Sequence, residues 1–188
     1  MVLLSTILTI TLIIWFLFGA YLPEFEVASI KLSNFSATNT SLSGAWTVAM
    51  FVKNVNMELH VDFHHAMSSV FYRDSLLGIV ALDPFHVPKT QRFALNFTVP
   101  ALRNPDDQRL HSWVLPTLAE DRSDGAVVVS LRLAMDANFT APDVVYRQES
   151  IRIYCEDLVI RFSPSTGEGT WSPGLGNPCF IRMRDSHD

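Results

Sequence analysis

The amino-acid sequence predicts an all-β fold, an antiparallel β-sandwich with one short helix, preceded by a single transmembrane helix. Three observations lead to this fold class. Apolar residues recur at every second position through much of the chain, turn-forming residues separate these stretches, and a mostly apolar run occupies residues 1–23. The first two features are typical of strands that bury one face, and the third is typical of a membrane-spanning helix.

Residues 1–23 are expected to form an uncleaved membrane anchor. They carry no charged side chain, and Leu3–Leu22 as a helix would span the roughly 30 Å hydrocarbon core of a bilayer. A cleaved signal peptide is the alternative, but its apolar segment is usually about 7–15 residues long, and cleavage after Ala20 would place Phe18 at the −3 position. No basic residue occurs before Lys31, so the positive-inside rule has only the α-amino group to act on. Because almost no cytoplasmic tail precedes the run, a chain that is short at its N-terminus is a further alternative.

Alternation with a period of two predicts about seven strands between residues 24 and 182. The longest case runs from Val127 to Phe139, where every odd position is apolar. Near the start, Phe25 is at an odd position whereas Ile30 is at an even one, which predicts a β-bulge around Ala28–Ser29. The other alternating stretches are 46–52, 59–67, 93–99, a terminal pair at 150–155 and 158–162, and an edge at 179–182. This pattern favours a sandwich of the immunoglobulin or fibronectin-III type.

Two segments depart from the alternation. Asp106–Glu120 has apolar residues near helical spacing, which predicts a short helix that is interrupted at Pro116 and covers one end of the sandwich. Residues 163–178 are rich in Gly, Pro and Ser and have no period, so they are expected to form a long loop. The domain is therefore expected to span residues 24–182, followed by a tail at 183–188.

Composition argues against a nucleic-acid binder, and the motifs give no sign of catalysis. The chain has 14 basic and 19 acidic residues, a net charge of −5, and no basic run. No Walker A, G-x-S-x-G or H-E-x-x-H pattern occurs. His60, Asp62 and His64 would share one strand face and could hold Zn²⁺ or Cu²⁺, but a polar outer face is the favoured interpretation. His65, on the apolar side, is expected to be an interior histidine. We expect no enzyme activity, cofactor or metal site.

Four glycosylation motifs and one cysteine pair indicate a lumenal or extracellular domain. The acceptor residues are Asn34, Asn39, Asn96 and Asn138. Asn96 and Asn138 are at even positions in strands whose odd residues are apolar, so both should face solvent, as a glycan requires. Cys155 and Cys179 are the only cysteines. A disulfide between them would stabilise the fold by about 3 kcal/mol; two free thiols in a reducing compartment are the alternative.

The order of several short motifs resembles a plant protein family. An apolar run leads into Pro23–Asn34, then come Trp46–Val48, Val52–Asn56 and Ser69–Arg73, and the two cysteines lie near the end. This set is similar to the plant late embryogenesis abundant group-two domain. More closely, it resembles the membrane proteins called non-race-specific disease resistance/harpin-induced-like. The resemblance extends from Leu3 to about Phe180.

The resemblance implies a single-pass plasma-membrane protein whose β-sandwich lies outside the cell and takes part in plant defence and stress responses. A lumenal domain on the endoplasmic reticulum membrane is the alternative location. The chain departs from the family's pattern at Asn54-Val55-Asn56, where Asn-Pro-Asn is usual, and at His60–His65, where the family is rich in tyrosine. The basic cytoplasmic lead of many members is also absent. These departures weaken any inference about a particular partner.

Two kinds of function remain open. The first is a non-enzymatic interaction or adhesion module that binds a protein or cell-wall partner through loops or an edge strand. The alternative is a lipid-handling domain beside the bilayer. A cavity of several hundred Å³ lined by Phe63, Phe93, Phe97 and Leu131 would favour lipid handling, whereas an interior filled by side chains would favour the interaction module.

Overall fold

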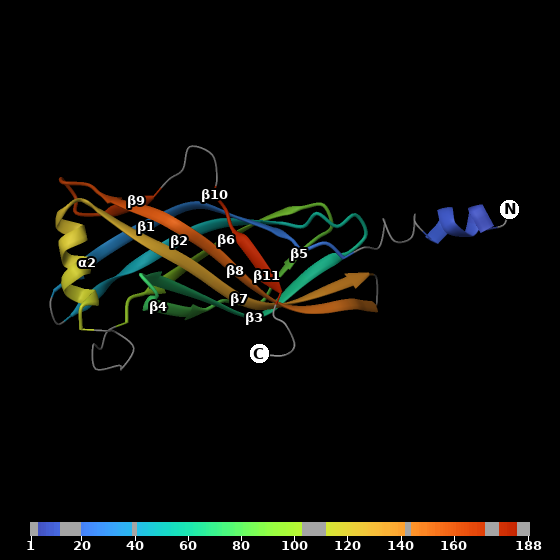
Figure 1. Ribbon diagram of the computed structural model, residues 1–188, viewed down its shortest axis with the longest axis horizontal. Coiled ribbons are helices and arrows are strands. Elements are labelled where there is room, and N and C mark those ends of the chain that lie inside the picture. The colour runs from blue at the N-terminus through green and yellow to red at the C-terminus, as the bar shows by residue number, and fades with distance from the viewer. Residues whose placement is uncertain are drawn as a thin grey trace.

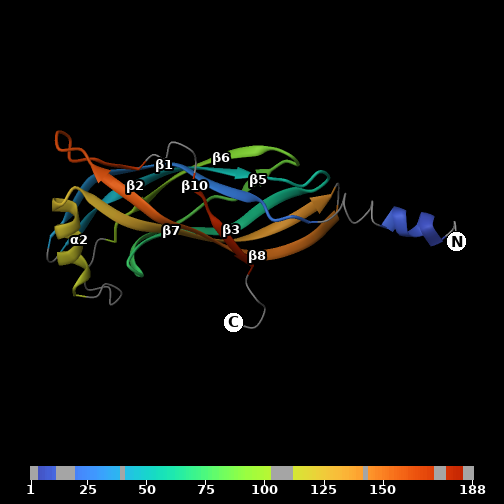
Figure 2. The same ribbon diagram turned by 45° about the horizontal axis from the view of Figure 1, so that its top comes forward.

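In the part of the chain that the structure describes, eleven antiparallel strands form one sheet that curls on itself (Figures 1 and 2). The computed structural model describes residues 4–11, 20–38, 41–102, 112–141, 144–171 and 177–183. The strands are β1 (Glu24–Ala37), β2 (Leu42–Lys53), β3 (His60–Tyr72), β4 (Ser75–Ala81), β5 (Phe85–Val87), β6 (Arg92–Pro100), β7 (Ala126–Ala141), β8 (Val144–Phe162), β9 (Gly169–Trp171), β10 (Asn177–Pro178) and β11 (Phe180–Met183). The body is elongated, and its strands run obliquely along it (Figure 1).

The sheet closes almost into a flattened barrel. Its main path runs β4–β3–β7–β8–β9–β1–β2–β6, and Gly78 of β4 forms a bridge with Ala101 just after β6. A Cβ atom at Gly78 would lie 2.4 Å from the carbonyl oxygen of Pro100, so this close approach requires glycine. In Figure 2, β1, β2 and β6 lie on one side of the body and β3, β7 and β8 on the other.

The all-β, antiparallel prediction is confirmed, whereas a sandwich of two separate sheets is not. The difference comes from β9, which lies inside the segment that we expected to be an irregular loop. Gly169 of β9 pairs with both Leu32 of β1 and Phe162 of β8. A Cβ atom at Gly169 would lie 2.6 Å from Ile160, so a glycine is needed here too. Through β9, the two halves become one continuous sheet.

Side chains of opposite strands fill the interior. The odd positions of β7 from Val127 to Phe139 are all buried, as the alternation predicts. The ring of Phe63 meets that of Phe25 edge-on at 5.9 Å and stacks on that of Phe85 at 4.6 Å, and Phe85 stacks on Phe93 at 5.3 Å. Full burial of one such side chain stabilises the fold by about 1.5–3 kcal/mol.

Bulges set which face each strand buries. The predicted bulge in β1 is confirmed by a register shift between Val27 and Ser29. A second shift, in β3 between His64 and Met67, reverses the phase of that strand. The prediction of an interior His65 is therefore wrong: its φ is +49°, its side chain is 85% exposed, and its Nδ1 lies 3.1 Å from a carboxylate oxygen of Asp136.

The C-terminal strands differ from the expected strand pair. Residues 150–155 and 158–162 belong to one long strand, β8, with a positive φ of 57° at Asp157 between them. The predicted edge at 179–182 is confirmed as β11, which pairs with β8. The described strands extend from Glu24 to Met183, and residues 184–188 of the expected tail lie outside the described residues.

The helix α2 (Val114–Ser123) lies at one end of the body (Figure 1) and buries Val114, Leu115 and Leu118. Pro116 does not interrupt it, because Pro116 occupies the first turn, where a backbone N–H has no acceptor within the helix. Residues 106–111 of the predicted helix lie outside the described residues. The hydroxyl of Tyr72 donates a hydrogen bond of 2.6 Å to Asp121 of α2. Burial, and next this bond, raise the pKa of Tyr72 to about 12.

Residues 4–11 are helical. Within the part of the chain that the structure describes, we find no helix with the length and apolar character needed to span a membrane. The predicted anchor at 1–23 includes residues 1–3 and 12–19, which lie outside the described residues.

Candidate functional site

The predicted disulfide is present in the structure. Cys155 of β8 is bonded to Cys179, which lies between β10 and β11, and their Cα atoms are 4.5 Å apart. The backbone N–H of Cys179 also donates to the carbonyl oxygen of Phe25 in β1. The C-terminal segment pairs with β1 through β10 and then with β8 through β11. The disulfide attaches this segment to β8 at the point between the two pairings.

The glycosylation motifs lie in different environments. Asn34 and Asn96 are exposed, and Asn34 has a positive φ of 51°. Asn138 faces outward from β7 but is half-buried between Asp62 of β3 and Gln148 of β8. Asn39 lies outside the described residues. Exposure therefore favours modification at Asn34 and Asn96 over Asn138.

Two histidine–carboxylate contacts lie in and beside the histidine-rich stretch of β3, namely His65 with Asp136 and His86 with Asp62. His86 of β5 lies 2.7 Å from Asp62, and its ring stacks on that of His60 at 5.4 Å. Within the described part of the chain, we find no group of three or more His, Cys, Asp or Glu side chains that could hold a metal ion. His60 and Asp62 of β3 therefore share a neighbour, His86 of β5. His64 lies apart from them and lines a separate hollow with His65 and Asp136.

The outer face of β3, β7, β8 and β11 carries the arrangement that is best suited to binding. Here arginine and aromatic side chains share one side of the sheet, opposite the core. We call this set the arginine–aromatic surface; its members are Phe71, Arg132, Arg152, Tyr154, Phe180 and Arg182. Two open hollows of about 360 and 240 Å³ lie on it and share Tyr154 in their lining.

Strand register places these side chains next to one another. Arg132 of β7 is directly opposite Tyr154 of β8, which is directly opposite Phe180 of β11. In the neighbouring row, Arg152 of β8 is directly opposite Arg182 of β11. Directly opposed residues on antiparallel strands point to the same face, with Cβ atoms about 4.5–5.5 Å apart.

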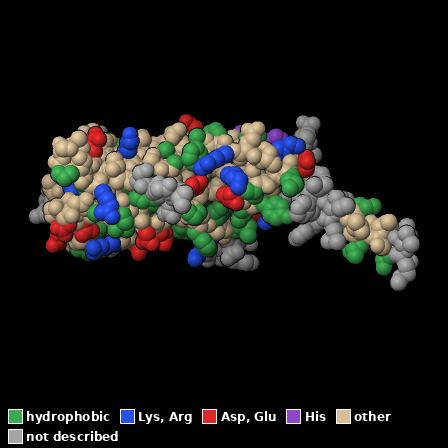
Figure 3. All heavy atoms as spheres, turned by 90° about the horizontal axis from the view of Figure 1, so that it is seen from above, with side chains coloured by type: hydrophobic (Ala, Val, Ile, Leu, Met, Phe, Trp, Pro, Cys, Tyr) green, Lys and Arg blue, Asp and Glu red, His purple; other side chains and the backbone are tan. Residues whose placement is uncertain are grey.

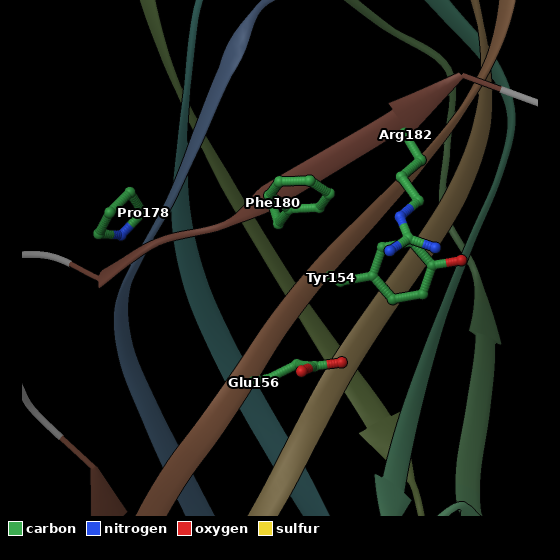
Figure 4. Close-up of a pocket in the computed structure, with 5 residues that line it drawn as sticks. All are labelled: Tyr154, Glu156, Pro178, Phe180 and Arg182. Atoms are coloured by element: carbon green, nitrogen blue, oxygen red, sulfur yellow. The ribbon is translucent and has the colours of Figure 1, made fainter.

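Guanidinium groups lie over the aromatic rings of this surface. Arg132 is 4.4 Å from the ring centre of Phe71 and 5.9 Å from that of Tyr154. Arg182 is 5.9 Å from the ring centre of Tyr154 and 5.6 Å from that of Phe180. Figure 4 shows Arg182 extending from β11 toward the ring of Tyr154 on β8, with Phe180 beside it on β11. These contacts hold the cationic groups in place while leaving Phe180 62% exposed.

The charges of this surface are only partly balanced. Arg132 pairs with Asp74 at 2.8 Å, and Glu156 adds a carboxylate at one side of the larger hollow. Arg152 and Arg182 form no ion pair with any described residue. Like charges directly opposite each other on a sheet are unfavourable. The surface therefore has two adjacent cations that an anionic ligand could neutralise.

A further, larger hollow of about 930 Å³ lies where the chain enters the domain. Its lining includes Leu22, Pro23 and Phe25. An ion pair joins Lys53 of β2 to Glu24 of the neighbouring strand β1, and another joins Arg92 of β6 to Glu26 of β1 across the intervening strand β2. Acidic and basic side chains are intermixed in the same way on the face seen in Figure 3. Because the charged side chains that line the 930 Å³ hollow pair with one another, this hollow is less suited to a charged ligand than the arginine–aromatic surface.

Asn54 and Asn56 have a role that the sequence analysis missed. Both are buried, with exposed fractions of 0% and 1%. The side-chain amide of Asn54 donates to the carbonyl oxygens of Leu59, Val87 and Pro88, and its oxygen accepts from the backbone N–H of Asn56. Asn56 in turn binds the backbone of Tyr21. The sequence feature that could have predicted this role is the Asn-x-Asn motif itself, which follows an apolar strand directly.

Comparison with known proteins gives a distant sequence relative. The chain is 20% identical over 163 residues to NDR1/HIN1-like protein 10 of Arabidopsis thaliana, which covers 86% of this chain and 70% of the relative. No family model matches the chain. Among solved structures, a crystal structure of a protein from Archaeoglobus fulgidus is similar with a TM-score of 0.39 and 12% identity, over 79% of this chain and 96% of that one.

Proposed function

We propose that this chain is a single-pass, non-enzymatic binding module of the plant plasma membrane that acts in defence and stress responses, with its β domain outside the cell. The similarity to NDR1/HIN1-like protein 10 supports the defence and stress part, because it extends over 86% of the chain. The uncharged run Leu3–Leu22 supports an anchor, and the disulfide supports a non-reducing compartment. The endoplasmic reticulum lumen is the alternative location.

The observation that carries the binding role is the arginine–aromatic surface. It presents aromatic rings and two guanidinium groups that pair with no described carboxylate on an outer face, and these side-chain types are enriched where proteins bind partners. The lipid-handling alternative required a cavity lined by Phe63, Phe93, Phe97 and Leu131. Instead, Phe63 packs between Phe25 and Phe85, and Leu131 is buried in the core. This packing favours the binding module.

Membrane topology provides the first test. The full chain with a C-terminal epitope tag is expressed in leaf cells, and intact protoplasts are treated with protease before carbonate extraction. We expect the tag to be digested in intact cells and the protein to stay with the membranes, because carbonate does not reverse apolar burial. A tag that is protected until the cells are permeabilised, or a protein released by carbonate, would contradict the proposal.

A matched variant tests the anchor itself. Leu12→Arg with Ile13→Arg places two charges in the apolar run, at a cost of about 2.5–3.5 kcal/mol for each charge at the centre of a spanning helix. We expect this variant to appear in the soluble fraction. In leaves challenged with an avirulent bacterium, expression of the parent chain should reduce bacterial growth more than expression of this variant. Equal growth with both chains would contradict a membrane-bound role in defence.

A further inference from the structure

Arg152 and Arg182 are directly opposed on β8 and β11, and both are exposed on the outer face. The chain does not lack acids that could pair with them, since acidic residues outnumber basic ones by 19 to 14. Some other surface cations do have acidic partners: Lys53 and Arg92, which are also directly opposed, pair with Glu24 and Glu26. Among the described residues, Arg152 and Arg182 are thus directly opposed cations that form no ion pair with a carboxylate.

We propose that the arginine–aromatic surface binds an acidic polysaccharide, a chain of uronic acid units, and that Arg152 and Arg182 hold its carboxylates. This inference rests on the proposed function, because it needs the β domain to face the cell wall. A guanidinium group presents a planar set of N–H donors that matches a carboxylate. Two such groups on neighbouring strands suit a ligand with negative charges at short intervals.

The third cation extends the site across the sheet. Arg132 of β7 is diagonal to Arg152 of β8, since Arg132 is opposite Tyr154 and Ala134 is opposite Arg152. Neighbouring strands are about 4.7–4.9 Å apart, so the three arginines form an oblique row across β7, β8 and β11, in which Arg132 is offset by two residues along the strand. The partner of Arg132, Asp74, is 87% exposed, so their ion pair is weak and open to exchange with a ligand.

The aromatic side chains distinguish a sugar polymer from a simple anion. Tyr154 and Phe180 lie directly beside the row of arginines, and 62% of Phe180 is exposed. An aromatic ring packs well against the C–H face of a pyranose, and a uronic acid unit carries such a face together with one carboxylate. Open hollows on a sheet face fit a linear chain that lies across the strands.

The disulfide should control this site. Cys179 immediately precedes β11, so its bond to Cys155 keeps Arg182 in register with Arg152. Without the bond, β11 is held by only four residue pairs with β8. Reduction should therefore weaken polysaccharide binding even where the rest of the domain stays folded.

The test measures binding of polygalacturonate oligomers to the full chain in detergent micelles by isothermal titration calorimetry. We expect Arg152→Gln with Arg182→Gln to raise the Kd about tenfold or more, and each single change to have a smaller effect. Arg161→Gln is the matched control, because Arg161 is an exposed arginine of the same strand that lies outside the site; its Kd should change less than about twofold. Thermal unfolding verifies that each variant is folded.

Three comparisons identify the ligand chemistry. Fully methyl-esterified oligomers, which lack the charge, should bind at least about tenfold more weakly, and higher salt should weaken binding of the free acid. Equal binding of the ester, or an unchanged Kd in the double variant, would overturn the proposal. Binding to vesicles of anionic phospholipid or to an acidic peptide, without binding to polygalacturonate, would overturn it in favour of those ligands.

The outcome is separable from that of the proposed function. The protoplast and bacterial-growth experiments can give the expected results while polygalacturonate fails to bind. That combination would overturn the polysaccharide ligand and would still support the membrane-bound module. Conversely, specific binding in micelles together with a protected tag would support the site and contradict the extracellular location.

Discussion

The side-chain amide of Asn56 makes two hydrogen bonds with the backbone of Tyr21. Its oxygen accepts from the N–H of Tyr21 at 2.7 Å, and its nitrogen donates to the carbonyl oxygen of Tyr21 at 2.8 Å. The amide therefore satisfies both backbone groups of a residue three positions before β1 begins. Asn54 orients it through a further hydrogen bond of 2.8 Å. This contact attaches the segment that follows the expected anchor to the body of the domain.

Replacing Asn56 should loosen that attachment. Asn56→Ala leaves the backbone groups of Tyr21 without their partners, and we expect the free energy of unfolding to fall by about 1–3 kcal/mol. Urea denaturation measures the loss, and limited proteolysis should cut near residues 20–24 faster. Asn96→Ala in unglycosylated protein is the control, because Asn96 is exposed. Equal stability and cleavage in the two variants would show that the contact has no structural role.

Removing the disulfide should destabilise the domain by about 2–4 kcal/mol. We expect this from Cys155→Ala and from Cys179→Ser, while the double variant should be no less stable than the worse single one, since both remove the same bond. Hydrogen exchange should increase in Phe180–Met183 and stay unchanged in α2. Two alkylated thiols in correctly exported protein would contradict the bond.

Glycan occupancy should follow exposure. We expect Asn34→Gln and Asn96→Gln each to remove one full step in mass that N-glycosidase also removes, because both side chains are exposed. Asn138→Gln should remove a partial step, since Asn138 is half-buried between β3 and β8. Gel mobility of protein from a plant secretory system gives the measurement. A protein of unglycosylated mass in the membrane fraction would place the domain on the cytosolic side.

Tyr72 should make the stability depend on pH above 10. Its folded-state pKa of about 12 lies above the unfolded value of 10.0, so the stabilisation is complete below pH 10 and is lost as the pH rises toward 12. Tyr72→Phe removes the hydrogen bond to Asp121, and we expect it to lower the free energy of unfolding by about 1–3 kcal/mol at pH 7. The variant should lose less stability than the parent between pH 10 and 12. An equal loss in both proteins would exclude Tyr72 as the source.

Much of the fold could be predicted because it depends on how often apolar residues recur along each strand. The odd positions of Val127–Phe139 are buried, and the bulge near Ala28–Ser29 is present. The phase of β3 beyond His65 could not be predicted, because its bulge lies in a continuous alternation. The sequence also did not predict that β9 connects β1 to β8, because a strand of three residues in a Gly-rich segment is too short to show alternation.

For the candidate site, the sequence by itself determined that any disulfide within the chain must join Cys155 to Cys179, since no other cysteine exists, and it placed Asn96 on an outward face. The structure then showed that the bond is formed. Only the tertiary structure decided that Arg152 is opposed to Arg182, that Tyr154 lies between Arg132 and Phe180, and that Asn56 binds Tyr21. These relationships depend on register between strands that are distant in the chain. A local pattern shows which face a residue occupies, but the side chain beside it comes from another strand, whose alignment is set by bulges and by packing across the whole sheet.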